Sequence, residues 1–189
     1  DYSAFHIKLI SNLINYPLPD NPHEYFGKQY LNKEILDQED YDLSKAISFK
    51  VVYGGIDDDY AIIPFFKKVY EFRKRLYEEY KKNGFIRSIV FERPIGKGKN
   101  LPEHKLFNYL LQSYETEYNS VIIKRILNYL HNKGTKLILY TYDSFLFNLN
   151  KHDGPEVIKK IKSIIFDSGL TGSIKIGKHY GELKKYDQI

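Results

Sequence analysis

The spacing of apolar residues predicts helices along most of this chain. Five segments carry the apolar face and the capping or stop signals of a helix, at residues 3–14, 42–53, 61–82, 102–132 and 155–167. Gly54-Gly55 and Asn83-Gly84 are the stop signals of the second and third of these helices. Pro17, Pro19 and Pro22 break the first helix, so we expect a polar loop there, followed by a weakly patterned stretch around Glu24 to Asp40.

Shorter apolar runs predict strands. Residues 86–93 are typical of a strand or hairpin, with residues 94–99 as its loop. Residues 136–142 and 145–149 are two β-prone runs separated only by Asp143-Ser144, the pattern of a tight hairpin with an acid at its tip. Residues 173–177 give a last strand. The sequence contains no repeats, so we predict one α+β unit.

The composition limits the kinds of partner and metal site that the chain can have. The chain has 189 residues, a formal charge of +5 and no cysteine, and its isoelectric point is near 9.0. Positive charge favours a polyanion partner, because each lysine or arginine set against a phosphate releases a counterion. Without cysteine there are no disulfides or thiolate sites, and a metal would need oxygen or imidazole ligands, of which oxygen ligands suit Mg²⁺. We find no apolar run long enough to span a bilayer, and we expect a soluble, truncated, cytoplasmic chain.

Two acids and one helical stripe are candidates for function. Asp143 interrupts an apolar hairpin, where a carboxylate costs free energy unless it is paired or binds a cation, although Asp is also a common turn residue. Asp1 precedes a helix and could simply cap it. Lys45, Phe49 and Tyr53 recur every fourth residue and so share one helix face. Taken singly, each of these residues has an ordinary explanation. Asp143 could be a turn residue, Asp1 a helix cap and Lys45 a solvated lysine, and Phe49 and Tyr53 could pack in the core.

Four short segments, in order, resemble the motifs of family A (DNA polymerase I type) DNA polymerases. Residues 1–10, DYSAFHIKLI, resemble motif A, and residues 45–54, KAISFKVVYG, resemble motif B of the fingers. Residues 108–113, NYLLQS, are similar to the Asn-x-x-x-Gln segment between motifs B and C, and residues 142–147, YDSFLF, to the motif C hairpin. The correspondence runs from residue 1 nearly to the end of the chain.

The resemblance implies a two-metal nucleotidyl transfer. Asp1 and Asp143 would hold two Mg²⁺ ions, assisted by the backbone carbonyl of Tyr2, and these ions would activate a primer 3′-hydroxyl and stabilise the leaving pyrophosphate. Lys45 would meet the incoming triphosphate and donate a proton to the leaving group. The catalytic residues are therefore expected to be Asp1, Asp143 and Lys45.

The resemblance also assigns contacts with the nucleotide and with DNA. Phe49 would pack beside the incoming dNTP, and Tyr53 would stack near the template base. The remaining expected contacts with primer-template DNA or the primer end come from Gly54, Asn108, Gln112 and Tyr142. Gly54 and Gly55 would let the helix end close to the template. For the aromatic residues the alternative is core packing, and for the polar pair Asn108 and Gln112 it is an ordinary surface.

Three positions depart from the family pattern. His6 stands where the family usually has a Glu that excludes the ribose 2′-hydroxyl, which leaves sugar selection open. Tyr41 replaces an Arg one turn before Lys45, which removes a triphosphate contact. Ser144 replaces the Glu of motif C, a change shared with single-subunit RNA polymerases.

From this resemblance we predict a phage-like palm and fingers fragment. Residues 1–15 and 101–189 would be mainly palm, with an antiparallel sheet backed by helices, and residues 16–100 mainly helical fingers. The expected function is template-directed DNA synthesis in replication, with the N-terminal polymerase domains and the strand before Asp1 missing, which leaves the activity of the fragment alone open. Two alternatives are a single-subunit RNA polymerase and an inactive nucleic-acid-binding palm domain.

Other candidate sites carry weaker signals. The three acids at 57–59 could bind a cation, but we expect them to cap the helix that starts near Ala61. Residues 96–99, GKGK, lack the spacing of a phosphate-binding P-loop. His104, His131, His152 and His179 show no metal-ligand spacing and are predicted to lie at the surface.

Overall fold

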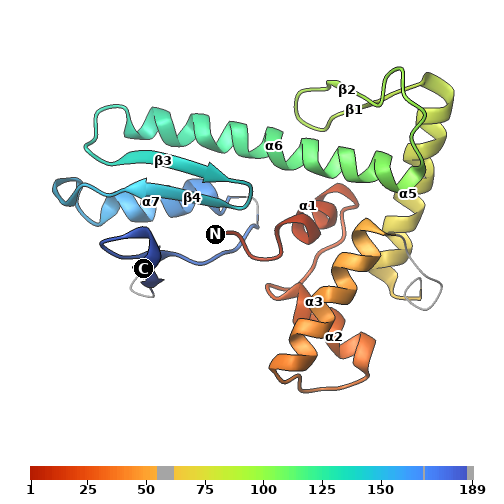
Figure 1. The fold of residues 1–189 in the computed structure, drawn as a ribbon, viewed down its shortest axis with the longest axis horizontal. Coiled ribbons are helices and arrows are strands. Elements are labelled where there is room, and N and C mark those ends of the chain that lie inside the picture. The colour runs from red at the N-terminus through yellow and green to blue at the C-terminus, as the bar shows by residue number, and fades with distance from the viewer. Residues whose placement is uncertain (55–61, 168, 187–189) are drawn as a thin grey trace. The chain divides into compact units, whose positions relative to one another are not determined.

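The computed structural model describes residues 1–54, 62–167 and 169–186, as helices with short antiparallel sheets (Figure 1). The chain divides into two compact units. Residues 6–117 form one, here called the helical unit, and residues 1–5 with 118–189 form the other, here called the hairpin unit. The mixed content of helices and antiparallel strands confirms the predicted α+β class.

Aromatic packing holds the helical unit together. Its elements are α1 (Phe5–Leu13), α2 (Pro22–Leu31), α3 (Gln38–Tyr53), α5 (Pro64–Asn83), β1 (Ile86–Arg87), β2 (Pro94–Ile95) and the first half of α6 (Glu103–Leu130). Phe26 of α2 is fully buried, with its ring centre 5.1 Å from that of Phe65 and 4.9 Å from that of Phe66 on α5. Aromatic rings at these distances add to the apolar area that they bury. Helix α2 is thereby fixed to α5.

The polar loop predicted at Pro17 and Pro19 separates α1 from α2, but the stretch from Glu24 to Asp40, where no helix was predicted, contains most of α2, which begins at Pro22. Proline is a good first residue of a helix, since its missing N–H would have no partner within the helix. The side chain of Asn21 caps α2 at the Glu24 amide, and Asn32 ends it in a left-handed conformation with φ 50°. Helix α3 also begins earlier than predicted, at Gln38, with a capping box between Asp37 and Asp40.

Helix α5 lies close to its predicted position, but the segment after it differs from the prediction. Gly84, at φ 74°, ends the helix as expected. The helix starts at Pro64 with Ile63 at its cap position, and the acids 57–59, which were predicted to cap it, lie outside the described residues. The region predicted as a loop begins with a strand, since β2 pairs with β1.

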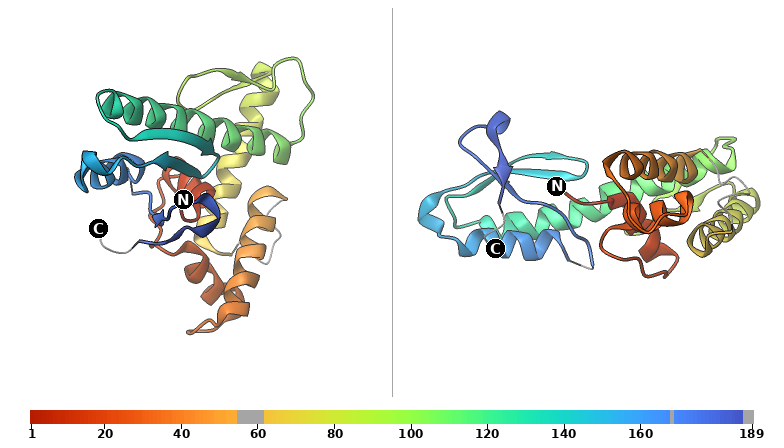
Figure 2. Two further views of the ribbon diagram at one scale, coloured as in Figure 1. Left: turned by 60° about the vertical axis from the view of Figure 1, so that its left-hand side comes forward. Right: turned by 90° about the horizontal axis from the view of Figure 1, so that it is seen from below.

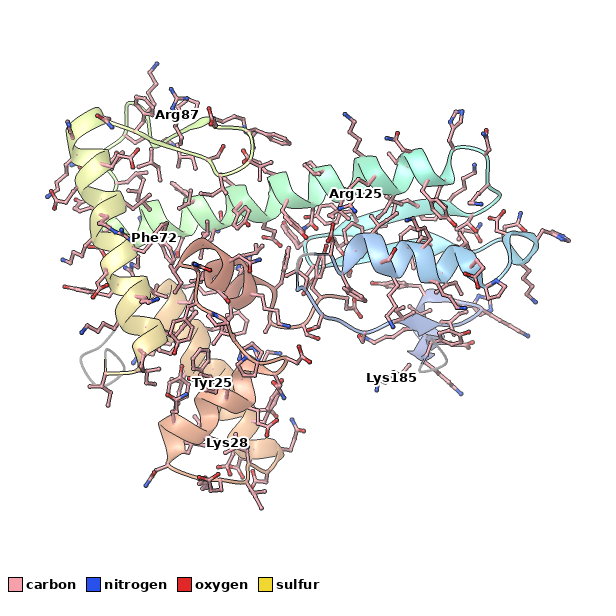
Figure 3. All side chains as sticks on the ribbon, turned by 180° about the vertical axis from the view of Figure 1, so that it is seen from behind. Tyr25, Lys28, Phe72, Arg87, Arg125 and Lys185 are labelled. Carbon is pink, nitrogen blue, oxygen red and sulfur yellow. The ribbon has the colours of Figure 1, made fainter. Side chains whose placement is uncertain are left out.

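The second half of α5 packs against α6 and the β1–β2 hairpin. Phe72 of α5, labelled in Figure 3, lies edge-on to Phe107 of α6 with ring centres 6.3 Å apart. A second cluster of buried side chains joins the end of α5, the hairpin and α6, formed by Tyr80, Ile86, Ile95, Leu101, Leu106 and Leu110. These contacts fix the first half of α6 within the helical unit.

The hairpin unit is a β-hairpin backed by two helices. Its elements are the second half of α6, β3 (Lys136–Thr141), β4 (Ser144–Asn148), α7 (Glu156–Ile165), β5 (Lys175–Ile176), β6 (Lys184–Lys185) and two short 3₁₀ turns at Lys151–Asp153 and Tyr180–Glu182. Figure 2 shows α7 running alongside α6 on one side of β3 and β4. Arg125 of α6, labelled in Figure 3, pairs with Asp167 just after α7 at 2.6 Å.

The hairpin turn lies one residue earlier than predicted. Thr141 pairs with Ser144, so the two turn residues are Tyr142 and Asp143, and Tyr142 adopts φ 48°. The predicted last strand is reduced to β5, which pairs with β6. Among the described residues, no helix is both long and apolar enough to cross a membrane.

Candidate functional site

The predicted site residues are divided between the two units, and the two groups are described separately. Asp1, Tyr2, Tyr142 and Asp143 lie in the hairpin unit. The helical unit holds the others, which are His6, Lys45, Phe49, Tyr53, Gly54, Asn108 and Gln112. Gly55 lies outside the described residues.

Backbone hydrogen bonds bring the segments of Asp1 and Asp143 together. The Tyr2 amide donates to the carbonyl oxygen of Asp143 at 2.8 Å. On the other side, Tyr2 bridges Gly172 in antiparallel fashion, and the Ser173 amide donates to the Asp1 carbonyl at 2.9 Å. A Cβ at Gly172 would lie 2.0 Å from the Asp1 carbonyl oxygen, so the close approach of these segments requires glycine there.

Both carboxylates of this pair are accessible to solvent. Asp143 is exposed at the hairpin turn, so the predicted cost of burying it does not arise. The Asp1 side chain is 42% exposed and forms an ion pair with Lys175, whose Nζ lies 3.0 Å from Asp1 Oδ2. Because exposed ion pairs contribute little free energy, a bound cation can displace Lys175 at low cost.

A buried asparagine that the sequence analysis missed holds this region. Asn119 of α6 is fully buried and donates from Nδ2 to the Tyr142 carbonyl and the Tyr140 hydroxyl, both at 2.9 Å. Its Oδ1 accepts the Tyr2 hydroxyl at 3.2 Å. Burial, with smaller effects of Tyr118 and Tyr140, raises the pKa of Tyr2 well above its ordinary value, so Tyr2 stays a neutral donor.

The oxygen ligands present here are suited to Mg²⁺. Asp1 and Asp143 offer hard carboxylate oxygens on adjoining backbone segments, and such ligands are those Mg²⁺ prefers. Among the described residues, no three or more His, Asp or Glu side chains are grouped as a metal site. A site made here would therefore use two carboxylates, with backbone, water or substrate oxygens completing the coordination.

In the helical unit, α3 exposes Lys45 and Phe49 of the predicted stripe, whereas Tyr53 is partly buried. Lys45 is exposed and Phe49 is 46% exposed, whereas Ser44, Ser48, Val51 and Val52 form the buried face. Phe49 stacks on Tyr53 with ring centres 5.9 Å apart and planes 9° apart. Core packing therefore does not explain Phe49, which leaves an aromatic surface beside a lysine.

His23 of α2 lies beneath this surface. It is 5% exposed, and its ring centre lies 6.2 Å from that of Phe49 and 6.1 Å from that of Tyr41. Burial, and secondly the charge of Lys45, lower the pKa of His23 to about 4. His23 is therefore neutral at pH 7, and the charge of Lys45 is not opposed by a protonated neighbour.

Three side chains fix the last turn of α3. The His6 Nδ1 contacts the hydroxyl of Tyr53, and His6 Nε2 lies 2.9 Å from Oε2 of Glu115 on α6. Asn108 Nδ2 donates to the Tyr53 carbonyl at 3.3 Å. Burial, and secondly the charge of Glu115, raise the pKa of Tyr53 to about 12. His6, Tyr53 and Asn108 are thus brought together, while Gln112 is exposed on α6 and Gly54 follows α3 as its cap.

Two buried acids on α6 were also missed. Glu115 is 7% exposed, and Glu117 is fully buried, where it accepts the amides of Val90 and Phe91 at 3.0 Å. Burial alone would raise the pKa of Glu117, but hydrogen bonds from Ser88, Phe91, Val90 and Arg93 outweigh it and lower the pKa. For Glu115 a signal was present, because Leu111, Glu115, Asn119 and Ile122 follow helical spacing along one apolar face.

The comparisons with known proteins show a similarity of fold. No protein-family model and no curated protein matches the chain. The chain is similar to a solved structure described as the POL domain of Pol1 from M. smegmatis in complex with DNA primer-template and dNTP, with a TM-score of 0.73 and 14% sequence identity. The similarity covers 87% of this chain and 35% of that one, so this chain spans about a third of its length. The chain therefore has a polymerase-like fold.

Proposed function

We propose that this chain is part of the catalytic core of a template-directed DNA polymerase, which adds dNTPs to a primer 3′-hydroxyl. The observation that carries the proposal is the 2.8 Å hydrogen bond from the Tyr2 amide to the Asp143 carbonyl, because it joins the segments of the two predicted catalytic acids, which lie far apart in the sequence. The polymerase-like fold supports it independently.

The role of the hairpin unit in this proposal is to present carboxylates on a fixed backbone. Asp1 and Asp143 would hold two Mg²⁺ ions, and the Tyr2 carbonyl would assist. When bound, such ions activate a hydroxyl nucleophile and neutralise phosphate charge. Asn119 would keep the Tyr142–Asp143 turn and Tyr2 in place, so that the carboxylates need little reorganisation when the ions bind.

The role of the helical unit is to receive the nucleotide on α3. Lys45 would bind the triphosphate and donate a proton to the leaving group, and Phe49 would pack beside the incoming base. Tyr53 would stack near the template base, with Gly54, Asn108 and Gln112 contacting primer-template DNA, while Tyr142 of the hairpin unit would approach the primer end. The exposure of Lys45 and Phe49 supports these assignments, because both are accessible to a ligand.

Primer extension by the complete protein that contains this sequence tests the proposal. We expect extension with dNTPs that requires Mg²⁺ and stops with EDTA. Asp143→Ala should abolish it, whereas Asp20→Ala, a change at an exposed acid between α1 and α2, should not. Circular dichroism of both variants checks that they fold.

Each other outcome points to a different function. Extension with rNTPs alone would replace the proposal with an RNA polymerase, as the residues His6 and Ser144 allow. DNA binding without extension would indicate an inactive nucleic-acid-binding domain. Full activity of Asp143→Ala would contradict the two-metal assignment.

A further inference from the structure

A buried carboxylate lies behind the aromatic surface of α3. Glu115 projects from α6 and is 7% exposed, and its Oε2 lies 2.9 Å from His6 Nε2. The opposite nitrogen of the same ring, Nδ1, contacts the Tyr53 hydroxyl. One imidazole therefore links an acid of α6 to the ring that stacks on Phe49.

This arrangement fixes the orientation of the His6 ring. Both ring nitrogens have partners, so a rotation that served one would break the contact of the other. A hydrogen bond to a charged group is stronger than a neutral one, and burial strengthens it further. The Asn108 bond to the Tyr53 carbonyl holds the backbone of the same residue, so both ends of Tyr53 are fixed.

We propose that Glu115 is a positioning residue of the nucleotide-binding surface, which acts through His6 to hold the Tyr53 ring against Phe49. The inference rests on the proposed function, since it assigns the stacked rings to the binding of a nucleotide. It adds a residue that none of the four sequence motifs contains. It also makes positions 6 and 115 a coupled pair, so the effect of a substitution at one position depends on which residue stands at the other.

The coupling gives an unusual expectation for His6→Glu. A glutamate at position 6 would face Glu115 at the place where the imidazole now lies 2.9 Å from it, and two close carboxylates repel. The single change should therefore weaken nucleotide binding, although glutamate is the usual residue at this position in the family that residues 1–10 resemble. Exchanging the residues, in His6→Glu with Glu115→His, restores an acid beside an imidazole.

Steady-state primer extension by the complete protein, with KM for dNTP and kcat measured separately, tests the pair. Loss of a hydrogen bond to a charged group corresponds to about a tenfold loss of affinity or more. We expect Glu115→Gln and His6→Glu each to raise KM about tenfold with little change in kcat. The exchanged double variant should recover most of that loss, and so should His6→Glu combined with Glu115→Gln, which removes the repulsion without requiring the exchanged geometry.

Glu79→Gln is the matched control, because Glu79 is an exposed acid on α5, and its KM should stay at the wild-type value. Urea unfolding identifies variants that fail to fold. A wild-type KM in Glu115→Gln would overturn this inference. So would increases in KM that multiply in both double variants, the exchanged one and His6→Glu with Glu115→Gln. In either case the polymerase activity of the wild-type protein would still stand. An inactive wild-type protein would overturn the proposed function and this inference with it.

Discussion

The two regions that carry the predicted site hold their residues in different ways. In the hairpin unit, backbone bonds and the buried Asn119 fix the chain, while the carboxylates of Asp1 and Asp143 stay exposed. On α3, one of the rings proposed to bind the nucleotide is itself fixed, because Tyr53 is held at its hydroxyl by His6 and at its carbonyl by Asn108.

The difference follows from what each region is proposed to bind. A cation needs oxygen ligands that can reach it, so a rigid backbone with accessible carboxylates is sufficient. A base or sugar is selected by shape, and shape is kept only if the surrounding side chains cannot rotate. Changes behind the hairpin should therefore affect stability and catalysis together, whereas changes on the α3 surface should affect nucleotide binding with little loss of stability.

The largest expected effect on stability is at Asn119. Asn119→Ala removes three hydrogen bonds and leaves the buried Tyr2 hydroxyl without its acceptor. Unsatisfied buried polar groups are costly, so we expect a loss of about 3 kcal/mol in the free energy of unfolding, measured with urea. Thr116→Ala, at an exposed position of the same helix, should cost less than about 1 kcal/mol. Equal losses in the two variants would show that Asn119 does not hold the hairpin.

The next effect is a pH dependence beneath the α3 surface. The pKa of His23 is lowered to about 4, so its contribution to stability is complete above the pKa of an unfolded histidine, about 6.5, and is lost as pH falls toward 4. Between pH 7 and pH 5 we expect a loss of about 2 kcal/mol in unfolding free energy. His23→Phe should remove that loss, and His131→Phe, at an exposed histidine, should keep it. The same pH dependence in His23→Phe would contradict the assignment.

The smallest effect on stability is expected at Phe49. It is 46% exposed, so Phe49→Ala should cost less than about 1 kcal/mol, while Val51→Ala, at a position 1% exposed on the opposite face, should cost about 2 kcal/mol. Nucleotide binding should show the reverse order, with KM for dNTP raised in Phe49→Ala and nearly unchanged in Val51→Ala. If Phe49→Ala were the less stable variant, Phe49 would be a core residue.

Much of the fold was predictable because its signals are local. Helix α5 ends at Gly84 as predicted, and the β3–β4 hairpin follows from two β-prone runs around a short turn. Helix α2 was missed because Pro22 was taken as a breaker, although the same residue can begin a helix. The turn of the hairpin was misplaced by one residue, because the Tyr142 backbone adopts a left-handed conformation that residues other than glycine, asparagine and aspartate rarely adopt.

The site was predictable only where a residue type and its spacing carry the signal. Lys45, Phe49 and Tyr53 share a helix face in any helical model, so their grouping could be predicted. The partners of that group could not, because His6 and Glu115 are joined by contacts between distant segments. The buried position of Glu115 and Asn119 was visible in principle, since both lie in line with the apolar residues Leu111 and Ile122 of α6.

The central claim is that Asp1 and Asp143 act as one site, and single-turnover dNTP incorporation by the complete protein tests it most directly. Two ligands of one site act as a unit, so their losses should not multiply. We predict that Asp1→Asn and Asp143→Asn each slow incorporation by at least about 10³-fold, and that the double variant is no slower than either. A near wild-type rate in either single variant, or losses that multiply in the double variant, would contradict the account.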